Sequence, residues 1–302
     1  MSETLPPIAF SGIALDADRR QWLQYMNTSL IDVCRELPGR LPDAAVLFLQ
    51  DRYADFSIYG LLNFFTLYHP PAWTILYWLH AEHGALDRAE LARCLRAQSM
   101  AMFLHMLDDH LVDGAVTPDH SVLQLRTLAW TIYEETVRSL EPGGAGVFER
   151  RAAEYFDAVH RPVVIVDLDG YCAAFPREMG TWKALPEIAA ARVLSAEAGT
   201  RLMRAYESFG VAWRILDDLR DVAEDGAAGV RTAVYWSLPE ADRSLWGTSA
   251  QAAVVERVLP DVYARMLACL RTAEEEAAAA GLRGLAQELR ELNPGPAVGR
   301  QD

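Results

Sequence analysis

The chain has 302 residues, of which 51% are hydrophobic and 23% are charged, a composition typical of a globular protein rather than a disordered or fibrous one. Its formal net charge of −14 argues against binding to nucleic acid or to anionic membrane surfaces, because both attract basic patches. We expect neither of these partners.

Apolar residues recur at three- and four-residue spacing along most of the chain, and Pro and Gly fall mostly between these segments. This pattern predicts an all-α fold. The predicted helices cover residues 16–36, 44–68, 71–83, 87–113, 118–140, 146–175, 186–225 and 251–291, with breaks at 141–144 and 176–186 and a kink or restart at Pro260. No linker is evident, so we expect one domain over residues 1–302, with flexible ends at about 1–15 and 293–302.

The cysteines form no C-x-x-C pair, and the first ten residues, MSETLPPIAF, lack the basic and apolar regions of a signal peptide. A cytoplasmic location is therefore expected. The most apolar stretch, residues 61–79, is interrupted by Asn63, His69 and the pair Pro70 and Pro71. It is too short between these residues to span a membrane, so no stable membrane insertion is expected.

Two aspartate clusters lie far apart on predicted helices, in HMLDDHLVDG and in RILDDLRDVAED. Residues four apart share a helix face, so the aspartates of each cluster are stacked and repel one another. Mg²⁺ would neutralise them, because it is held by one or two carboxylates together with substrate phosphate oxygens. The sequence therefore predicts a diphosphate clamp, with metal ligands Asp108, Asp109, Asp113, Asp217, Asp221 and Asp225.

Large side chains lie on the same helix face as each cluster, one or more turns before it. They are the predicted substrate-binding residues: Met102, His105 and Met106 in the first helix, and Tyr206, Phe209 and Trp213 in the second. Each stripe alone is typical of ordinary core. A pocket lined by both stripes, with metal at its mouth, would suit a long hydrocarbon that carries a diphosphate. The aromatic faces would stabilise a carbocation through their quadrupoles.

The motifs DDHLVD and DDLRD resemble the two aspartate-rich motifs of the class I isoprenoid synthase superfamily, which includes polyprenyl diphosphate synthases, squalene and phytoene synthases, and terpene cyclases. The resemblance covers roughly residues 61–238. It implies a helical bundle around a central apolar cavity, and an allylic diphosphate of about C10–C20 as the substrate. It also implies Mg²⁺ on both motifs, about three ions with substrate bound, and it is compatible with a homodimer.

The basic residues favour one branch of this superfamily. Chain-elongating synthases carry a Gly-Lys-Arg segment before the first motif and paired arginines after it, whereas this chain has one lysine, Lys183, and no arginine between Asp113 and Arg126. The spacing of Asp217, Asp221 and Asp225 matches the second metal motif of terpene cyclases. In cyclases the three residues are usually Asn or Asp, then Ser or Thr, then Glu, whereas all three are Asp here.

Arg177 and Gly180 in FPREMGTW resemble a cyclase's diphosphate-sensing arginine and the helix-breaking glycine that follows it. We therefore expect a Mg²⁺-dependent terpene synthase that ionises an allylic diphosphate and releases diphosphate as the terpene forms. The residues predicted to contact the diphosphate during catalysis are Arg177, Lys183 and Arg231.

A prenyltransferase is the alternative function. The segments DHLVDG and LRDVAEDGAAG also resemble the acidic motifs of squalene and phytoene synthases, which join two diphosphates head to head. Bacterial prenyltransferases that use a non-isoprenoid acceptor likewise keep two acidic motifs without the second basic site. The alternative therefore includes chain-elongating, head-to-head and acceptor-prenylating enzymes.

Two hypotheses come from other classes. Residues 163–170, VVIVDLDG, resemble the strand and DxDG motif of haloacid dehalogenase-type phosphatases, with Asp167 as nucleophile and Asp169 as acid and base. That motif needs a β-strand in an alternating α/β chain, whereas helical periodicity surrounds it here. The other hypothesis is a non-catalytic helical binding protein, against which the intact acidic clusters argue.

Overall fold

The computed structural model describes residues 9–53, 63–141, 146–160 and 164–293. Within these ranges the backbone forms α-helices and short 3₁₀ helices joined by turns, and no described residue lies in a strand. The all-α prediction is therefore confirmed.

The chain folds into two compact units, and each combines segments that are distant in sequence. The α4 unit comprises Ala14–Tyr155 and Met179–Gly199. The α9 unit comprises Met1–Ile13, Phe156–Glu178 and Thr200–Asp302. The single domain and its central cavity stay predictions. Most of the ends predicted to be flexible lie outside the described residues, although Phe10 is buried.

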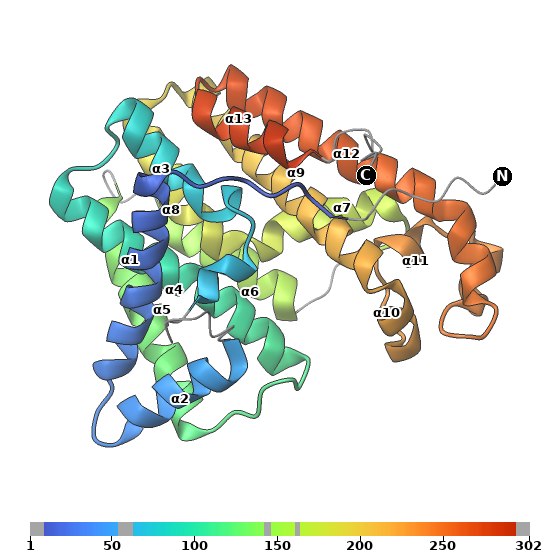
Figure 1. The fold of residues 1–302 in the computed structure, drawn as a ribbon, viewed down its shortest axis with the longest axis horizontal. Helices are drawn as coiled ribbons and strands as arrows, with labels where there is room; N and C mark the ends of the chain where they lie inside the picture. The colour runs from blue at the N-terminus through green and yellow to red at the C-terminus, as the bar shows by residue number, and fades with distance from the viewer. Residues whose placement is uncertain (1–8, 54–62, 142–145, 161–163, 294–302) are drawn as a thin grey trace, which may run out of the picture. The chain divides into compact units, whose positions relative to one another are not determined.

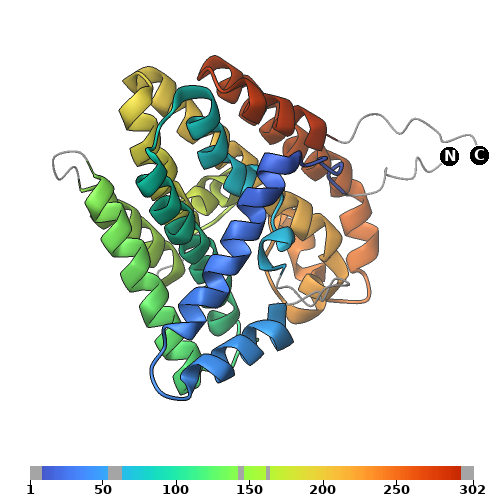
Figure 2. The same ribbon diagram turned by 60° about the vertical axis from the view of Figure 1, so that its left-hand side comes forward.

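The α4 unit is built around α4 (Arg88–Val112), which is buried on most of its faces from Cys94 to Asp108, as expected of a helix that is apolar all round. α4 packs against α1, α5 and α8, and Figures 1 and 2 show α1 and α5 beside it. The other helices are α1 (Ala17–Arg35), α2 (Leu41–Tyr53), η1 (Phe64–Leu67), α3 (Pro71–His83), α5 (His120–Leu140), the start of α6 (Val147–His160) and α8 (Gly180–Val193).

Aromatic side chains hold the middle of α4 in place. The ring of Phe103 packs edge-on against Phe64, with centroids 5.7 Å apart, and Tyr68 packs edge-on against Trp182 at 5.6 Å. The Tyr68 hydroxyl also donates a hydrogen bond to the carbonyl of Met102, 2.7 Å away. Aromatic pairs of this kind each add about 0.5–1.5 kcal/mol beyond their buried area. The helix turns just before Asp108 are therefore firmly anchored.

The α9 unit is built around α9 (Ala196–Arg220) and the long helix α12 (Gln251–Ala279). α12 and α13 (Arg283–Leu292) form a helical hairpin, which Figure 1 shows. The turn between them contains Gly281 at φ +89°, a conformation that favours glycine. The remaining elements are α7 (Leu168–Glu178), α10 (Val222–Ala228), α11 (Ala233–Ser237) and η3 (Glu240–Leu245).

Several predicted helix boundaries agree closely with the structure. The predictions 16–36 and 87–113 match α1 and α4, because Asp16 and Asp87 accept backbone hydrogen bonds as N-caps and Glu36 and Asp113 are the C-caps. The prediction 71–83 matches α3, which ends at Gly84 in a left-handed conformation.

Other boundaries were wrong. The predicted helix 146–175 is two helices, α6 and α7, and the predicted break at 176–186 is confined to Met179, because Pro176 and Pro186 both lie inside helices. The helix predicted over 186–225 is divided into α8, α9 and α10. The prediction 251–291 spans α12 and α13, and Pro260 does not end α12. Residues 54–62, predicted to be helical, lie outside the described residues.

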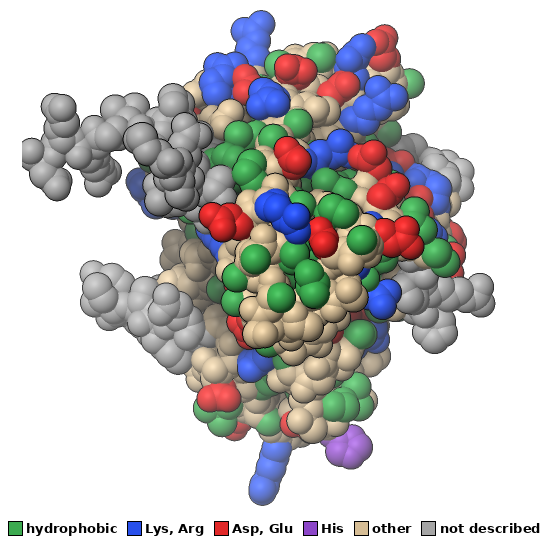
Figure 3. Space-filling model, turned by 90° about the vertical axis from the view of Figure 1, so that its right-hand side faces the viewer, with side chains coloured by type: hydrophobic (Ala, Val, Ile, Leu, Met, Phe, Trp, Pro, Cys, Tyr) green, Lys and Arg blue, Asp and Glu red, His purple; other side chains and the backbone are tan. Residues whose placement is uncertain are grey.

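No described helix is both long enough and apolar enough to cross a membrane. On the face drawn in Figure 3, acidic and basic side chains are interspersed with apolar ones, so the negative charge is not gathered into one patch there. All four cysteines are free thiols: Cys34, Cys94, Cys172 and Cys269.

Gly180, the first residue of α8, lies against α6. A Cβ atom at this position would be 2.4 Å from the Arg151 carbonyl oxygen and 3.0 Å from Tyr155 Cβ. We predict that Gly180→Ala lowers the free energy of unfolding by about 1–3 kcal/mol through overpacking, measured by urea denaturation. Gly199→Ala is the control, because no atom lies within 4 Å of its Cβ position and the loss of backbone freedom in the unfolded chain should be mildly stabilising. Equal stability of the two variants would contradict the prediction.

Candidate functional site

The first acidic segment lies at the end of α4. Asp109 and Asp113 are exposed there, and the backbone N–H of Asp113 donates to the Asp109 carbonyl 3.0 Å away, so the two residues stay one helical turn apart. The predicted face is therefore present, and both carboxylates are accessible to a cation.

Asp108 has a different environment from its neighbour Asp109. It is buried, with 6% of its surface exposed, and its two oxygens accept hydrogen bonds from Arg126 Nε at 2.5 Å and Nη2 at 2.9 Å. The Tyr155 hydroxyl donates a third hydrogen bond to Asp108 at 3.0 Å. These three hydrogen bonds occupy most of the acceptor capacity of the carboxylate, so a metal ion would compete with Arg126 and Tyr155 for Asp108, whose role as a ligand stays a prediction.

The side chains predicted to line a pocket in the α4 unit are buried or half-buried. His105 packs edge-on against Trp182 with centroids 4.6 Å apart, and Met102 is completely buried. Met106 is half-buried, and Tyr155 lies 6.4 Å from the His105 ring. Burial raises the pKa of Tyr155, and the charge of Asp108 raises it further, so this phenol stays protonated and donates.

The sequence pattern also missed a contact of His110, which follows Asp109. The His110 ring stacks on Tyr53 with centroids 5.5 Å apart, and its Nδ1 is hydrogen-bonded to the Tyr53 hydroxyl at 2.9 Å. Burial lowers the pKa of His110, although Asp109 opposes this. Because Tyr53 is 57 residues away in the sequence, no local spacing could have indicated the pair.

The second acidic segment crosses from α9 into α10. α9 ends at Arg220, and Asp221 leaves the helical conformation with φ −101° and ψ 13°. The helical hydrogen bonds nevertheless continue, since the N–H of Asp221 donates to Asp217 at 3.1 Å and that of Asp225 donates to Asp221 at 2.8 Å. The single-helix prediction was wrong, yet the spacing of one turn between successive aspartates is kept.

Asp218 is the buried member of the second acidic pair, with 3% of its surface exposed. It forms an ion pair with Arg214 at 3.4 Å and accepts the backbone N–H of Ala233 at 2.9 Å. Arg214 Nε in turn donates to the Tyr171 hydroxyl at 2.9 Å. Burial raises the pKa of Asp218, and the positive charge of Arg214 opposes that effect. Asp218 therefore ties α9 to α7 and to the start of α11.

Asp225 carries the clearest electrostatic sign of crowding. Burial raises its pKa to about 6, and the neighbouring carboxylates of Asp218, Asp221 and Asp217 add to the shift. A divalent cation would relieve this repulsion, and carboxylate oxygens are the hard donors that Mg²⁺ prefers. The carboxylate donors of the second segment are therefore of the type that Mg²⁺ prefers. Among the described residues, however, no three His, Cys, Asp or Glu side chains are gathered closely enough to form a metal site, so the metal ligands stay a prediction.

The predicted phosphate contacts have three different environments. Arg177 is partly exposed and lies 3.8 Å from Asp157, a loose surface ion pair. Lys183 is 2% exposed, and its Nζ lies 3.8 Å from Glu154 in the α4 unit. Arg231 is exposed, with its guanidinium 5.4 Å from the centre of the Tyr235 ring. The predicted helix break after Arg177 is present, because α7 ends at Glu178 and α8 begins at Gly180.

The aromatic stripe of α9 is present as predicted from helical spacing. Tyr206 and Phe209 are buried, and Trp213 is half-buried with its ring stacked on Phe209, the centroids 6.2 Å apart. Their role in binding a substrate stays a prediction.

The phosphatase-like segment is the start of a helix rather than a strand and loop. Val163 lies outside the described residues, and α7 begins at Leu168. Asp167 accepts the backbone N–H of Gly170 at 2.8 Å, as a residue before a helix does, and Asp169 pairs with Arg265 at 2.8 Å. The described residues therefore lack the strand that the phosphatase hypothesis requires.

No protein-family model matches the sequence, and no curated protein matches it. Solved structures are similar in fold. A geranylgeranyl pyrophosphate synthetase from the archaeon Geoglobus acetivorans has a TM-score of 0.65 and 14% identity, and the match covers 90% of this chain and 96% of that one. A polyprenyl synthetase from Streptomyces coelicolor A3(2) has a TM-score of 0.62 and 14% identity over 90% of this chain and 98% of that one.

A geranylgeranyl pyrophosphate synthase from Lactobacillus brevis ATCC 367 is also similar, with a TM-score of 0.60 and 15% identity over 91% of this chain and 96% of that one. The chain has the class I isoprenoid synthase fold. This confirms the resemblance that the two acidic motifs indicated.

The prediction of a terpene synthase is wrong on this comparison. The similar solved structures described above are named as geranylgeranyl pyrophosphate and polyprenyl synthetases, not as terpene cyclases. The spacing of the aspartates did not identify the branch, because carboxylates at every fourth residue can hold Mg²⁺ and diphosphate whether the prenyl group is cyclised or transferred.

The two aspartates at the end of α4 should differ in their effect on stability. We predict that Asp108→Asn lowers the free energy of unfolding by about 2–3 kcal/mol, because Arg126 and Tyr155 lose a charged, buried partner. Asp109→Asn should change it by less than about 0.5 kcal/mol, since Asp109 is exposed. Urea denaturation in EDTA measures both. Similar losses of unfolding free energy in the two variants would contradict the assignment of Asp108 as the structural aspartate and Asp109 as the exposed one.

Asp225 should make stability depend on pH. Its pKa is about 6 in the folded protein, against an ordinary value of 3.8, so the folded state holds the proton more tightly than the unfolded state. The free energy of unfolding should therefore fall as the pH rises from about 4 to about 6 and stay reduced above that. Without divalent cations, Asp225→Asn should be more stable than the wild type at neutral pH by about 1 kcal/mol after solvent screening, and equal to it near pH 4.

Urea denaturation across this pH range tests the prediction for Asp225. Asp261→Asn, which removes one exposed carboxylate from α12, is the control for net charge. Parallel pH profiles for the wild type and Asp225→Asn would show that the raised pKa is not a property of the folded protein.

Proposed function

We propose that the protein is a Mg²⁺-dependent prenyltransferase of isoprenoid biosynthesis. It would take an allylic diphosphate of about C10–C20, transfer the prenyl group to a nucleophilic acceptor and release diphosphate. The observation that carries the proposal is the similarity, over 90% of this chain, to a geranylgeranyl pyrophosphate synthetase and a polyprenyl synthetase, in a chain with two acidic segments.

The exposed and crowded carboxylates are the proposed metal ligands: Asp109 and Asp113 in the first segment, and Asp217, Asp221 and Asp225 in the second. When bound at these residues, Mg²⁺ would supply charge neutralisation for the diphosphate leaving group. Asp108 and Asp218 would instead hold their segments in place, since each is buried and paired with an arginine.

The basic side chains would add contacts to the diphosphate. Arg231 is the best placed of the three predicted residues, because it is exposed and its guanidinium lies over aromatic rings that restrict its motion. Arg177 is held only by a loose surface ion pair, so a phosphate can compete for it. Lys183 is buried beside Glu154, so its contribution would require a rearrangement in the α4 unit.

The hydrocarbon chain would lie against the predicted lining residues. Phe209 and Trp213 present stacked rings, whose faces stabilise positive charge on an allylic carbon as the C–O bond to diphosphate breaks. Exclusion of water by such side chains would prevent capture of the carbocation by solvent. The homodimer and the cytoplasmic location stay predictions from the sequence.

The acceptor is the remaining chemical choice. Isopentenyl diphosphate is the first candidate, because the similar structures are named as a geranylgeranyl pyrophosphate synthetase and a polyprenyl synthetase. A specific contact favours an acceptor without a diphosphate as the second candidate. Arg126, the first arginine after Asp113, donates two hydrogen bonds to Asp108, so it is already paired and would have to leave that carboxylate to bind a second diphosphate.

The assay that tests this function incubates the protein and Mg²⁺ with C10, C15 and C20 allylic diphosphates, with and without isopentenyl diphosphate. We predict a lengthened prenyl diphosphate when isopentenyl diphosphate is present. Asp109→Ala should reduce Mg²⁺-dependent turnover by about 100-fold or more, because a ligand that neutralises the leaving group is lost. Asp51→Ala, an exposed aspartate on α2 of the same unit, is the control and should keep full activity.

Diphosphate release that requires a different nucleophile would favour the second candidate. No Mg²⁺-dependent release from any of the allylic diphosphates would overturn the proposed function, and full activity of Asp109→Ala would overturn the metal assignment.

A further inference from the structure

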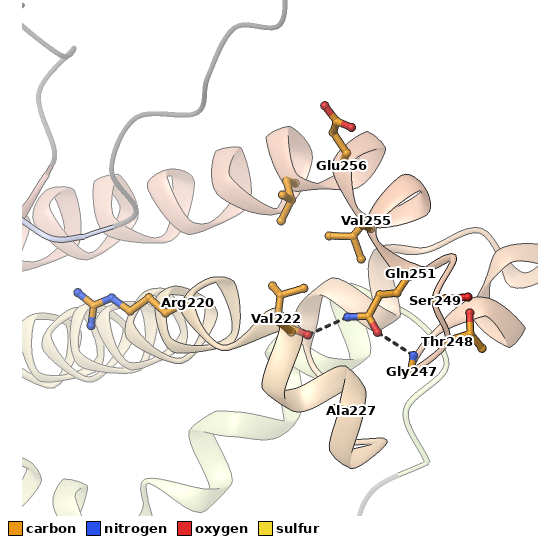
Figure 4. A pocket seen from close by; sticks show the side chains of 12 residues that line it. Arg220, Val222, Ala227, Gly247, Thr248, Ser249, Gln251, Val255 and Glu256 are labelled. Atoms are coloured by element: carbon orange, nitrogen blue, oxygen red, sulfur yellow. Dashed lines mark hydrogen bonds between the residues drawn. The ribbon is translucent and has the colours of Figure 1, made fainter.

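The helix α10, which carries Asp225, has little packing on one side. An open cavity of about 570 Å³ lies between it and the start of α12, as Figure 4 shows. Its apolar lining includes Val222, Ala223 and Ala227 of α10, and Val255 and Leu259 of α12. Side chains that face a cavity lose the van der Waals contacts of a packed core. A helix of seven residues is also unstable by itself, so something other than packing must hold α10.

The side chain of Gln251 supplies that attachment. Its Nε2 donates a hydrogen bond to the carbonyl of Val222 at 2.8 Å, and its Oε1 accepts the backbone N–H of Gly247 at 2.7 Å. Figure 4 shows both bonds, with the amide lying between α10 and the turn that precedes α12. Gln251 is the first residue of α12, a helix of 29 residues, so the short α10 is tied to a long element.

Two glycines make room for this bridge. A Cβ atom on Gly226 would lie 2.0 Å from Gln251 Oε1 and 2.3 Å from Nε2, so any larger residue there would push the amide away. Gly247 has φ +75°, and a Cβ atom on it would lie 2.6 Å from the carbonyl oxygen of Gly226. Only glycine fits at both positions without a shift. The bridge is therefore built into the local backbone rather than being an accidental surface contact.

The bridge is attached next to the acidic residues. Val222 follows Asp221, so the hydrogen bond to its carbonyl fixes the backbone one residue beyond that carboxylate. The amide also lies against Gly226, the residue after Asp225, because a Cβ atom there would be 2.0 Å from Gln251 Oε1. The junction itself is weak, because Asp221 departs from helical geometry between α9 and α10. Without the bridge, the end of the segment would still be held by the hydrogen bond from Trp246 Nε1 to the Val230 carbonyl at 2.9 Å, but the first turn of α10 would lose its tie to α12. The distance from Asp225 to Asp221 and Asp217 would then vary.

We infer that Gln251 is a positioning residue for the second acidic segment: its amide sets the spacing of Asp221 and Asp225 and so the affinity of the segment for Mg²⁺. The inference deepens the proposed function and rests on it for the identity of the cation. Gln251 does not touch the proposed substrate, so its effect should appear in the Mg²⁺ dependence of turnover rather than in the rate at saturating Mg²⁺.

The test compares Gln251→Ala and Gln251→Glu with the wild type. Glutamate keeps the acceptor for Gly247 but replaces the donor to Val222 with an oxygen that repels the carbonyl, so it should behave like alanine. Two measurements are made: amide hydrogen exchange over residues 222–230 without metal, and the Mg²⁺ concentration for half-maximal turnover. Gln287→Ala, an exposed glutamine on α13 with side-chain hydrogen bonds of its own, is the matched control.

We expect about tenfold faster exchange over residues 222–230 and about a tenfold higher Mg²⁺ requirement in both Gln251 variants, in line with the loss of one hydrogen bond, while Gln287→Ala leaves both unchanged. Urea denaturation confirms that each variant is folded. Unchanged exchange in folded Gln251 variants overturns the inference, even if the wild type proves to have no prenyltransferase activity. Faster exchange with an unchanged Mg²⁺ requirement in an active enzyme also overturns it.

Discussion

Carboxylates that are buried or crowded need positive partners, and the structure meets this need differently for adjacent residues. In each doublet of aspartates, one residue is buried against an arginine: Asp108 against Arg126, and Asp218 against Arg214. The other, Asp109 or Asp217, is exposed. Neighbouring residues on a helix point about 100° apart, so a doublet cannot place both carboxylates on one face. The buried acid holds neighbouring helices together through its hydrogen bonds, and the exposed acid is the one that a cation can reach.

The buried acids explain why each segment has a fixed local structure. Asp108 connects α4 with α5 through Arg126 and with α6 through Tyr155. Asp218 connects α9 with the start of α11 through the N–H of Ala233. Breaking a buried charge pair leaves an unpaired charge, which is far more damaging than the loss of a surface ion pair. Asp109 and Asp217 are thus carried by backbone that these buried acids hold in place, whereas Asp225 lies beyond the irregular junction at Asp221.

Local signals predicted the parts of the fold that local chemistry determines. The ends of α1 and α4 followed from Asp16 and Asp87, whose side chains cap the helices within three residues. The prolines misled, because Pro186 is buried inside α8, where packing offsets its cost to the helix. α11 was not predicted because a helix of five residues is too short to show helical periodicity. Its first backbone N–H also donates to Asp218, a residue 15 positions away, so no local capping residue indicated where it begins.

In the candidate site, too, contacts between residues close in sequence were predictable and contacts between distant residues were not. The stacking of Asp109 with Asp113 and the aromatic stripe of α9 follow from helical spacing and were predictable. The contact between Tyr155 and Asp108 joins residues 47 positions apart, and the bridge from Gln251 to Val222 spans 29, so neither has a local signature. The choice of branch failed for a related reason, since carboxylate spacing reports on the diphosphate and not on what becomes of the prenyl group.

The path of the chain between the two units has a consequence for fragments of the protein. The backbone passes from one unit to the other after Ile13, Tyr155, Glu178 and Gly199, so neither unit is a continuous stretch of sequence. No single proteolytic or recombinant fragment can therefore contain one whole unit and nothing of the other.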